Sequence, residues 1–162
     1  MIPKKIQAAF NAQIKAEMDS AYLYLSMAAY FKSQTLDGME HWMKVQAKEE
    51  MGHAMKFFDF ILERGGKVEL AGLAEPKARW SSALDAFKNT YEHEQVVTAR
   101  IHALVKLADS QDDPASLNFL QWFVNEQVEE EANAIEIVAT LERVGASGAG
   151  LVMLDRELGK RE

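Results

Sequence analysis

The chain contains no cysteine among its 162 residues. This absence excludes disulfide bonds, iron–sulfur clusters, thiolate zinc sites and a cysteine nucleophile. Any metal site must therefore use oxygen and imidazole ligands. Proline and glycine are also scarce, with three and nine residues, and all three prolines fall outside the periodic stretches. The sequence is therefore suited to a few long helices.

Long hydrophobic runs and an excess of positive charge are absent as well. The longest apolar stretch, residues 21–31, is far shorter than the roughly 20 residues that cross a bilayer. The chain has 25 acidic and 18 basic residues, which gives a net charge of -7. This balance argues against nucleic acid and membranes as partners and favours cations. No apolar leader follows the first residues, so we expect a cytoplasmic protein.

Residues that start and stop helices divide the chain into five segments. Asp37, Ser81 or Ser82, and Asp113 are expected N-caps, and Pro114 is suited to the first position of a helix. We expect helices at about residues 6–32, 38–64, 82–110, 114–144 and 150–158.

The connections predict how these helices are arranged. Short turns after the first and third helices make two antiparallel pairs, whereas residues 65–81 could extend about 55 Å and cross the whole bundle. A long crossover distinguishes the ferritin-like topology from a simple up-down-up-down bundle, although a loop of this length also has other uses. We therefore predict an all-α fold: one ferritin-like four-helix domain over residues 1–162, with the crossover between helices two and three and a short C-terminal fifth helix.

Each long helix carries an apolar stripe that metal-binding groups interrupt near its middle. The interrupting residues are Glu17 on the first helix, Gln46, Glu50 and His53 on the second, Glu94 on the third, and Gln127 and Glu130 on the fourth. The stripes contain no lysine or arginine that would neutralise the four glutamates. Burying bare carboxylates costs several kcal/mol each. A bound cation removes this penalty.

The spacing of these residues repeats between the two halves of the chain. Glu17 precedes Glu50 by 33 residues and His53 by 36, and Glu94 precedes Gln127 and Glu130 by the same two intervals. A duplicated helical hairpin would arrange these positions around a pseudo-twofold axis. Two facing half-sites, and hence two metal ions, are the natural expectation.

The ligand types narrow the choice of metal. One imidazole with four or more carboxylates suits Fe, Mn or Mg, and the histidine favours iron. Glu50 and His53, three residues apart on one helix face, can reach the same ion, and Glu50 could bridge to a second. Glu94 and Glu130 would hold that second ion.

At these residues the chain resembles the bacterial non-haem ferritins. The similar segments cover nearly the whole chain and include residues 17–24, 49–53, 91–95 and, most specifically, 119–131 (FLQWFVNEQVEEE). The resemblance implies one iron at Glu17, Glu50 and His53, a second at Glu50, Glu94 and Glu130, and Gln127 beside them. It also implies a third iron site, at Glu49, Glu126, Glu129 and Glu130. Tyr24 matches a tyrosine next to the centre and is counted with the catalytic residues, although it could equally be a core tyrosine.

The resemblance further implies a function and an assembly. Members of this family are ferroxidases that oxidise Fe(II) with O₂ or hydrogen peroxide and store ferric oxide inside a homo-oligomeric shell of 24 subunits. Residues 150–158 match the short fifth helix that lines the fourfold axes of the shell. The alternative is a flap that covers its own bundle.

Several alternatives remain open at this stage. Met51 matches the position of the haem-ligating methionine of bacterioferritins, but Gln127 stands where a symmetric site would carry glutamate, so no haem is expected. A di-iron oxidase or peroxidase without storage and a metal-free interaction bundle are the other candidates. Trp122 is predicted to lie in the core, with electron donation as its alternative role. Three solitary histidines, His41, His93 and His102, are predicted to be surface or capping residues.

Overall fold

The computed structural model describes residues 1–162 as five helices without strands. They are α1 (Lys4–Ser33), α2 (Asp37–Glu63), α3 (Ala83–Ser110), α4 (Pro114–Val144) and α5 (Gly148–Leu158). The all-α prediction is confirmed, and each helix begins and ends within two residues of its expected position. No helix has the combination of length and apolarity that a membrane span requires.

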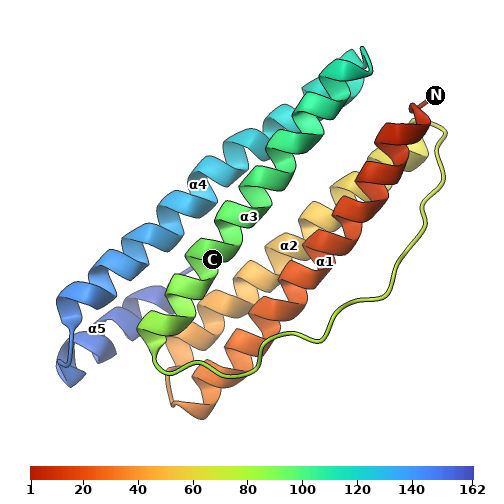
Figure 1. Ribbon diagram of the computed structural model, residues 1–162. Helices are drawn as coiled ribbons and strands as arrows, with labels where there is room; N and C mark the ends of the chain where they lie inside the picture. Colours follow the sequence, from red (N-terminus) through yellow and green to blue (C-terminus); the bar gives the residue numbers. More distant parts are fainter.

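The long helices form two antiparallel pairs, α1 with α2 and α3 with α4 (Figure 1). The segment between α2 and α3 runs along the outside of α1, from one end of the bundle to the other. Side chains of α1 fix it there. Asn11 donates to the carbonyl of Lys67 and accepts from the backbone N–H of Glu69, and Ser26 donates to the carbonyl of Lys77. The expected crossover is therefore present.

The helix ends follow the sequence signals only in part. Ser82 caps α3 as expected, because its hydroxyl accepts from the backbone N–H of Asp85 at 3.0 Å. Pro114 opens α4, but the Asp113 carboxylate accepts from the Ser116 hydroxyl and pairs with Arg64 instead of capping the backbone. The prediction of Asp113 as a side-chain cap was wrong because these two partners hold its oxygens.

The start of α2 also differs from the expectation. Asp37 is the first residue of α2 rather than its cap, and its carboxylate pairs with Lys32. The backbone N–H of Met39 donates instead to the Asp155 carboxylate of α5, at 2.8 Å. This interaction is long-range, so the sequence around residue 37 does not reveal it.

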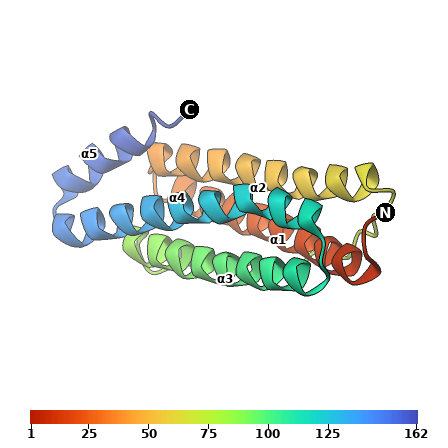
Figure 2. The same cartoon turned by 90° about the horizontal axis from the view of Figure 1, so that it is seen from above.

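The fifth helix packs across the end of the bundle next to α2 (Figure 2). Leu151, Leu154 and Leu158 contact the apolar core, whereas Val152 and Met153 are exposed. The helix therefore covers its own bundle and still presents an apolar face to the outside.

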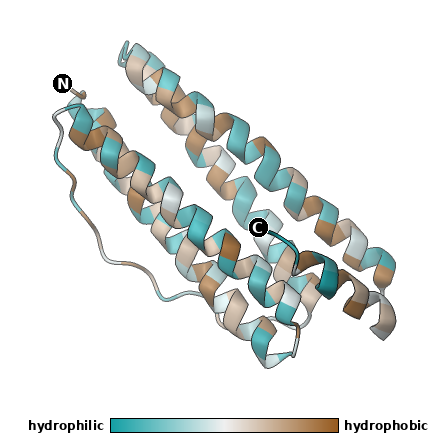
Figure 3. Ribbon diagram, turned by 180° about the vertical axis from the view of Figure 1, so that it is seen from behind, coloured by the Kyte–Doolittle hydropathy of each residue, from teal (hydrophilic) through white to brown (hydrophobic).

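The core consists of two apolar clusters separated along the bundle. One surrounds Phe31, Trp42 and Phe87, and the other surrounds Phe10 and Phe57. Brown and teal residues alternate along each long helix in Figure 3, as the striped pattern requires. Between the two clusters lies a layer of buried polar residues that all four long helices contribute: Gln13, Glu17, Ser20, Gln46, Glu50, His53, Thr90, Glu94, Gln127 and Glu130.

Candidate metal centre

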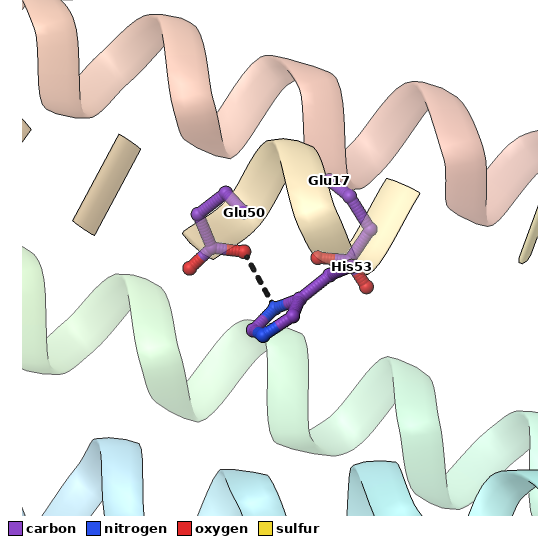
Figure 4. Close-up of side chains that lie close together, drawn as sticks. All are labelled: Glu17, Glu50 and His53. Carbon is purple, nitrogen blue, oxygen red and sulfur yellow. Dashed lines mark hydrogen bonds and ion pairs between the residues drawn. The ribbon is translucent and has the colours of Figure 1, made fainter. Parts of the chain in front are cut away.

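The centre of the polar layer is formed by Glu17 of α1 and by Glu50 and His53 of α2. One ligand atom of each lies within 4.8 Å of those of the other two, and all three side chains are buried. Figure 4 shows the two carboxylates converging on the imidazole, whose Nδ1 lies 3.2 Å from Glu50 Oε2. The helical spacing of three residues places Glu50 and His53 on one face of α2, as the sequence predicts.

Glu94 enters the layer from α3 and is held by two hydrogen bonds. The Tyr24 hydroxyl donates to one of its oxygens, and Gln127 Nε2 donates to the other at 3.1 Å. Glu94 belongs to no group of three ligand atoms as compact as that of Glu17, Glu50 and His53. The structure thus places Glu94, Tyr24 and Gln127 together, with the carboxylate directed to these two donors.

Gln46 connects the two halves of the layer. Its amide nitrogen donates to Glu50 at 3.2 Å and to Glu130 at 3.0 Å, so it links α2 with α4. Glu130 is also part of a second compact group, with His53 and Glu126, in which His53 Nε2 lies 3.8 Å from Glu126 Oε1.

The four residues expected at a third iron site are only partly brought together. Glu126 and Glu130 lie in the compact group with His53. Glu129 is exposed and outside that group, and Glu49 pairs with Arg161 of the C-terminal tail. Glu126 and Glu130 thus come together beside His53. Glu129 faces solvent, and Glu49 faces Arg161.

Burial dominates the electrostatics of the layer. It raises the pKa of Glu17 and Glu50 well above the ordinary value of a glutamate, and the negative charges of neighbouring glutamates raise both further. Hydrogen bonds from Gln13 and Gln46 oppose the shift, because amide donors favour the charged carboxylate. Without a cation, these carboxyls hold their protons to an unusually high pH.

The other half of the layer shows the same effect. Burial, with the charge of Glu94, raises the pKa of Glu130 to about 7. Burial also raises the pKa of Glu94, although the donors Tyr24 and Gln127 oppose the shift. The pKa of the Tyr24 phenol is raised by burial and by the adjacent carboxylates, so Tyr24 remains a hydrogen-bond donor at neutral pH.

Two buried oxygens in the polar layer, one of Glu17 and one of Gln46, have no hydrogen-bond partner, and the carboxylate oxygen is the one that can bind a cation. Glu17 Oε2 is buried and has no hydrogen-bond partner, and Glu17 has no cationic residue paired with it. A buried acceptor of this kind is costly when it is left alone. The residues therefore fit a bound cation, and their carboxylate-rich donor set fits a hard one.

Sequence reasoning placed Gln46 on the stripe of the second helix but missed its role as a hydrogen-bond donor, and it missed Gln13 altogether. Gln13 donates to Glu17 at 2.8 Å and Gln46 donates to Glu50, and each glutamine precedes its glutamate by four residues. This spacing puts both members of a pair on one helix face. A glutamine one turn before the stripe glutamates of α1 and α2 was thus the available signal.

Two aromatic residues near the layer differ from their sequence-based expectation. Trp122 is 39% exposed rather than core, although its ring lies edge-on to His53 with centroids 5.4 Å apart. His93 is not a simple surface residue: it is half-buried, bonds Ser20 at 2.7 Å and lies edge-on to Tyr24. Both residues therefore contact the layer from its edge.

Met51 lies away from the layer, on the outer face of α2. Its side chain is 42% exposed and borders an apolar depression that also includes Tyr22, Leu25 and Leu73. Met51 is therefore separate from the carboxylates, although only one residue separates it from His53 in the sequence.

Comparisons with known proteins agree with this geometry. The ferritin family, described as a ferritin-like domain, matches residues 7–144. The chain is 44% identical over 161 residues to a bacterial non-heme ferritin of Bacteroides fragilis, covering 99% of this chain and 100% of that protein. A bacterial non-heme ferritin of Staphylococcus aureus is 37% identical, with 99% and 97% covered. A crystal structure described as a novel open pore ferritin from Archaeoglobus fulgidus superimposes with a TM-score of 0.99 at 53% identity, over the full length of both chains.

Proposed function

Because the chain belongs to the ferritin family, we propose that it is an iron-storage protein with ferroxidase activity. Two Fe(II) ions bind in the polar layer and are oxidised to Fe(III), which is then deposited as ferric oxide inside a shell of 24 identical subunits. The relatives named as bacterial non-heme ferritins support iron as the substrate.

One observation carries the proposal: the middle of an otherwise apolar bundle holds four buried glutamates and a histidine, and no lysine or arginine lies among the buried residues. Structural ion pairs would need basic partners there. A divalent cation neutralises two carboxylates at once and also satisfies the free oxygen of Glu17.

The residues divide between the two ions as follows. Glu17, Glu50 and His53 hold the first ion, and Glu50, Glu94 and Glu130 hold the second, with Gln127 beside them. Glu94 reaches its ion by exchanging a hydrogen bond from Tyr24 or Gln127 for the metal. This exchange leaves the donor free to bind another oxygen atom at the centre, which is the role we assign to Tyr24.

The oxidation balances with one O₂ for two ions. Each Fe(II) gives one electron, and O₂ takes up two electrons and two protons to become hydrogen peroxide. The raised pKa of Glu130 and its neighbours means that metal binding releases protons from these carboxyls within the layer. Hydrogen peroxide can replace O₂ as the oxidant.

A third ion binds at the edge of the layer, at Glu126 and Glu130 with Glu49 and Glu129. Glu126 and Glu130 already lie together beside His53. Glu49 and Glu129 are more exposed, so they connect the buried centre with solvent. Iron that leaves the centre passes this site on its way to the mineral.

A di-iron oxidase acting on a small organic substrate is the second candidate function. A surface hollow of about 280 Å³ lies beside the layer and includes Lys56, Phe60, Trp122 and Phe123. Trp122 and Phe123 both contact His53, so a molecule in this hollow would be near the metal ions.

The site assignment is tested by Glu50→Ala and His53→Ala. Each removes a ligand of the first ion, so we expect the initial rate of aerobic Fe(II) oxidation to fall at least tenfold, measured by the absorbance of Fe(III) in the first seconds. Glu63→Ala is the matched control, because Glu63 is an exposed glutamate on the same helix. Wild-type rates in both ligand variants would refute the assignment.

A further inference from the structure

The C-terminal tail, residues 159–162, folds back from α5 onto α2 and is held there by Arg161. His41 Nε2 donates to the backbone carbonyl of Arg161 at 2.7 Å. The guanidinium carbon lies 4.3 Å from the centre of the Trp42 ring, which is a cation–π distance. The Arg161 side chain is only 18% exposed. Two residues of α2 therefore hold Arg161 in place: His41 contacts its backbone and Trp42 contacts its side chain.

The guanidinium of Arg161 points to Glu49, and Nη2 donates to Glu49 Oε2 at 2.5 Å. The second terminal nitrogen, Nη1, is buried without a hydrogen-bond partner. Arg161 therefore has one carboxylate for its charge, and that carboxylate belongs to the group assigned to the third iron ion. The positive charge of Arg161 also favours the charged form of Glu130, another member of that group.

We propose that Arg161 is a built-in competitor for the third iron ion: it occupies Glu49 in the metal-free chain and must release it before Glu49 can bind metal. This inference rests on the proposed function, because it concerns the same group of glutamates. The guanidinium and a divalent ion both need the Glu49 carboxylate. Two cations on one carboxylate lie close together, so their positive charges repel each other. The tail contact and full coordination of the third ion therefore exclude one another.

The competition has a consequence in each direction. The third ion binds more weakly than it would without Arg161, so the two buried positions fill first. Binding of the third ion in turn loosens the tail, because coupling between two binding equilibria is reciprocal. When the third ion leaves, the guanidinium takes its place at Glu49.

The test uses the full-length, metal-free assembly and Zn(II), which binds without being oxidised. Zn(II) is titrated into the wild type, Arg161→Gln and Lys160→Gln, and the dissociation constants of the successive ions are measured by calorimetry. The Arg161–Glu49 pair is partly exposed, so we expect the weakest ion to bind about fivefold more tightly in Arg161→Gln. The ion at Glu17, Glu50 and His53 should be unchanged, because Arg161 pairs with none of these residues. Lys160→Gln removes the same charge from the neighbouring residue, whose ammonium pairs with Glu157, and should change nothing.

Two further measurements sharpen the result. In a Glu49→Gln background the Arg161→Gln substitution should lose its effect, since the shared carboxylate is gone. Saturating Zn(II) should also speed hydrogen exchange of the wild-type tail amides.

The competition would be refuted if the third Zn(II) ion bound to Arg161→Gln with the wild-type dissociation constant, or if Lys160→Gln tightened its binding as much as Arg161→Gln. Either result would leave the two-ion centre intact. Failure of the wild type to bind even two ions would instead overturn the proposed function.

Discussion

At the centre of the bundle, four glutamates and one histidine are buried, and the amides of Gln13 and Gln46 donate hydrogen bonds to three of the carboxylates. The burial of Glu17, Glu50, His53 and Glu94 follows from helical periodicity, because each interrupts an apolar stripe. The hydrogen bonds among these residues do not follow from periodicity, because they depend on the side-chain rotamers. Gln46 is an example: its place on the stripe was evident, but its link between Glu50 and Glu130 depends on the distance between α2 and α4.

Replacing Gln46 tests whether its amide tunes the centre. Gln46→Leu removes a donor from Glu50 and from Glu130, so both carboxyls lose stabilisation of their charged form. Because hydrogen bonds to charged groups contribute about 1.5–3 kcal/mol, we expect the pH midpoint of Co(II) binding to rise by about one unit. The midpoint is followed by the visible absorbance of Co(II). Gln95→Leu, at an exposed position on α3, should leave the midpoint unchanged.

The raised pKa values predict how stability depends on pH without metal. The folded chain holds protons on Glu130 up to about pH 7, whereas the unfolded chain releases them near 4.5. The folded state therefore binds more protons in this range, and the free energy of unfolding falls as pH rises through it. For Glu130 alone the loss is about 3 kcal/mol between pH 4.5 and 7.

Denaturant unfolding of the metal-free protein at several pH values measures this slope. Glu130→Gln removes the titrating group and keeps its shape, so the decline between pH 5 and 7 should become shallower. A metal-free protein whose stability rises over this range would contradict the electrostatic account.

The helices themselves were largely predictable, and their ends were less so. Glycine marks where α2 and α4 end, proline marks where α4 begins, and these signals are local. The contact of α5 with the start of α2 is not local, because it joins residues 116 positions apart. Only the folded chain shows that Asp155, rather than Asp37, satisfies the N-terminus of α2.

The contact between α5 and α2 depends on Gly38. A Cβ at this position would lie 1.7 Å from the backbone carbonyl oxygen of Asp155, so any side chain must push α5 away. Gly38→Ala should therefore speed hydrogen exchange throughout α5 and lower stability. Gly52→Ala is the matched control on the same helix, because nothing lies within 4 Å of its added Cβ. We expect that variant to be more stable by about 1 kcal/mol, as for glycine replacement inside a helix.

The whole molecule combines a rigid bundle with surfaces that favour assembly. Two apolar clusters flank the polar layer along the bundle, and the metal ions that we propose would remove the cost of burying its carboxylates. The outer face of α1 and α2 exposes Tyr22, Leu25 and Met51 around one depression, which Leu73 of the crossover segment also borders. Contiguous apolar patches of this kind mark protein interfaces. The 24-subunit shell that we propose would cover such surfaces, but a single sequence does not encode the number of copies in any local pattern.

The most direct test of iron storage is to load the purified protein with Fe(II) in air and then measure particle mass and iron per subunit together. Storage predicts a shell of about 440 kDa before loading, from 24 copies of 18.2 kDa, and iron far above the two or three ions that one subunit can ligate. A particle near 18 kDa, or iron that stops at two ions per subunit, would contradict it.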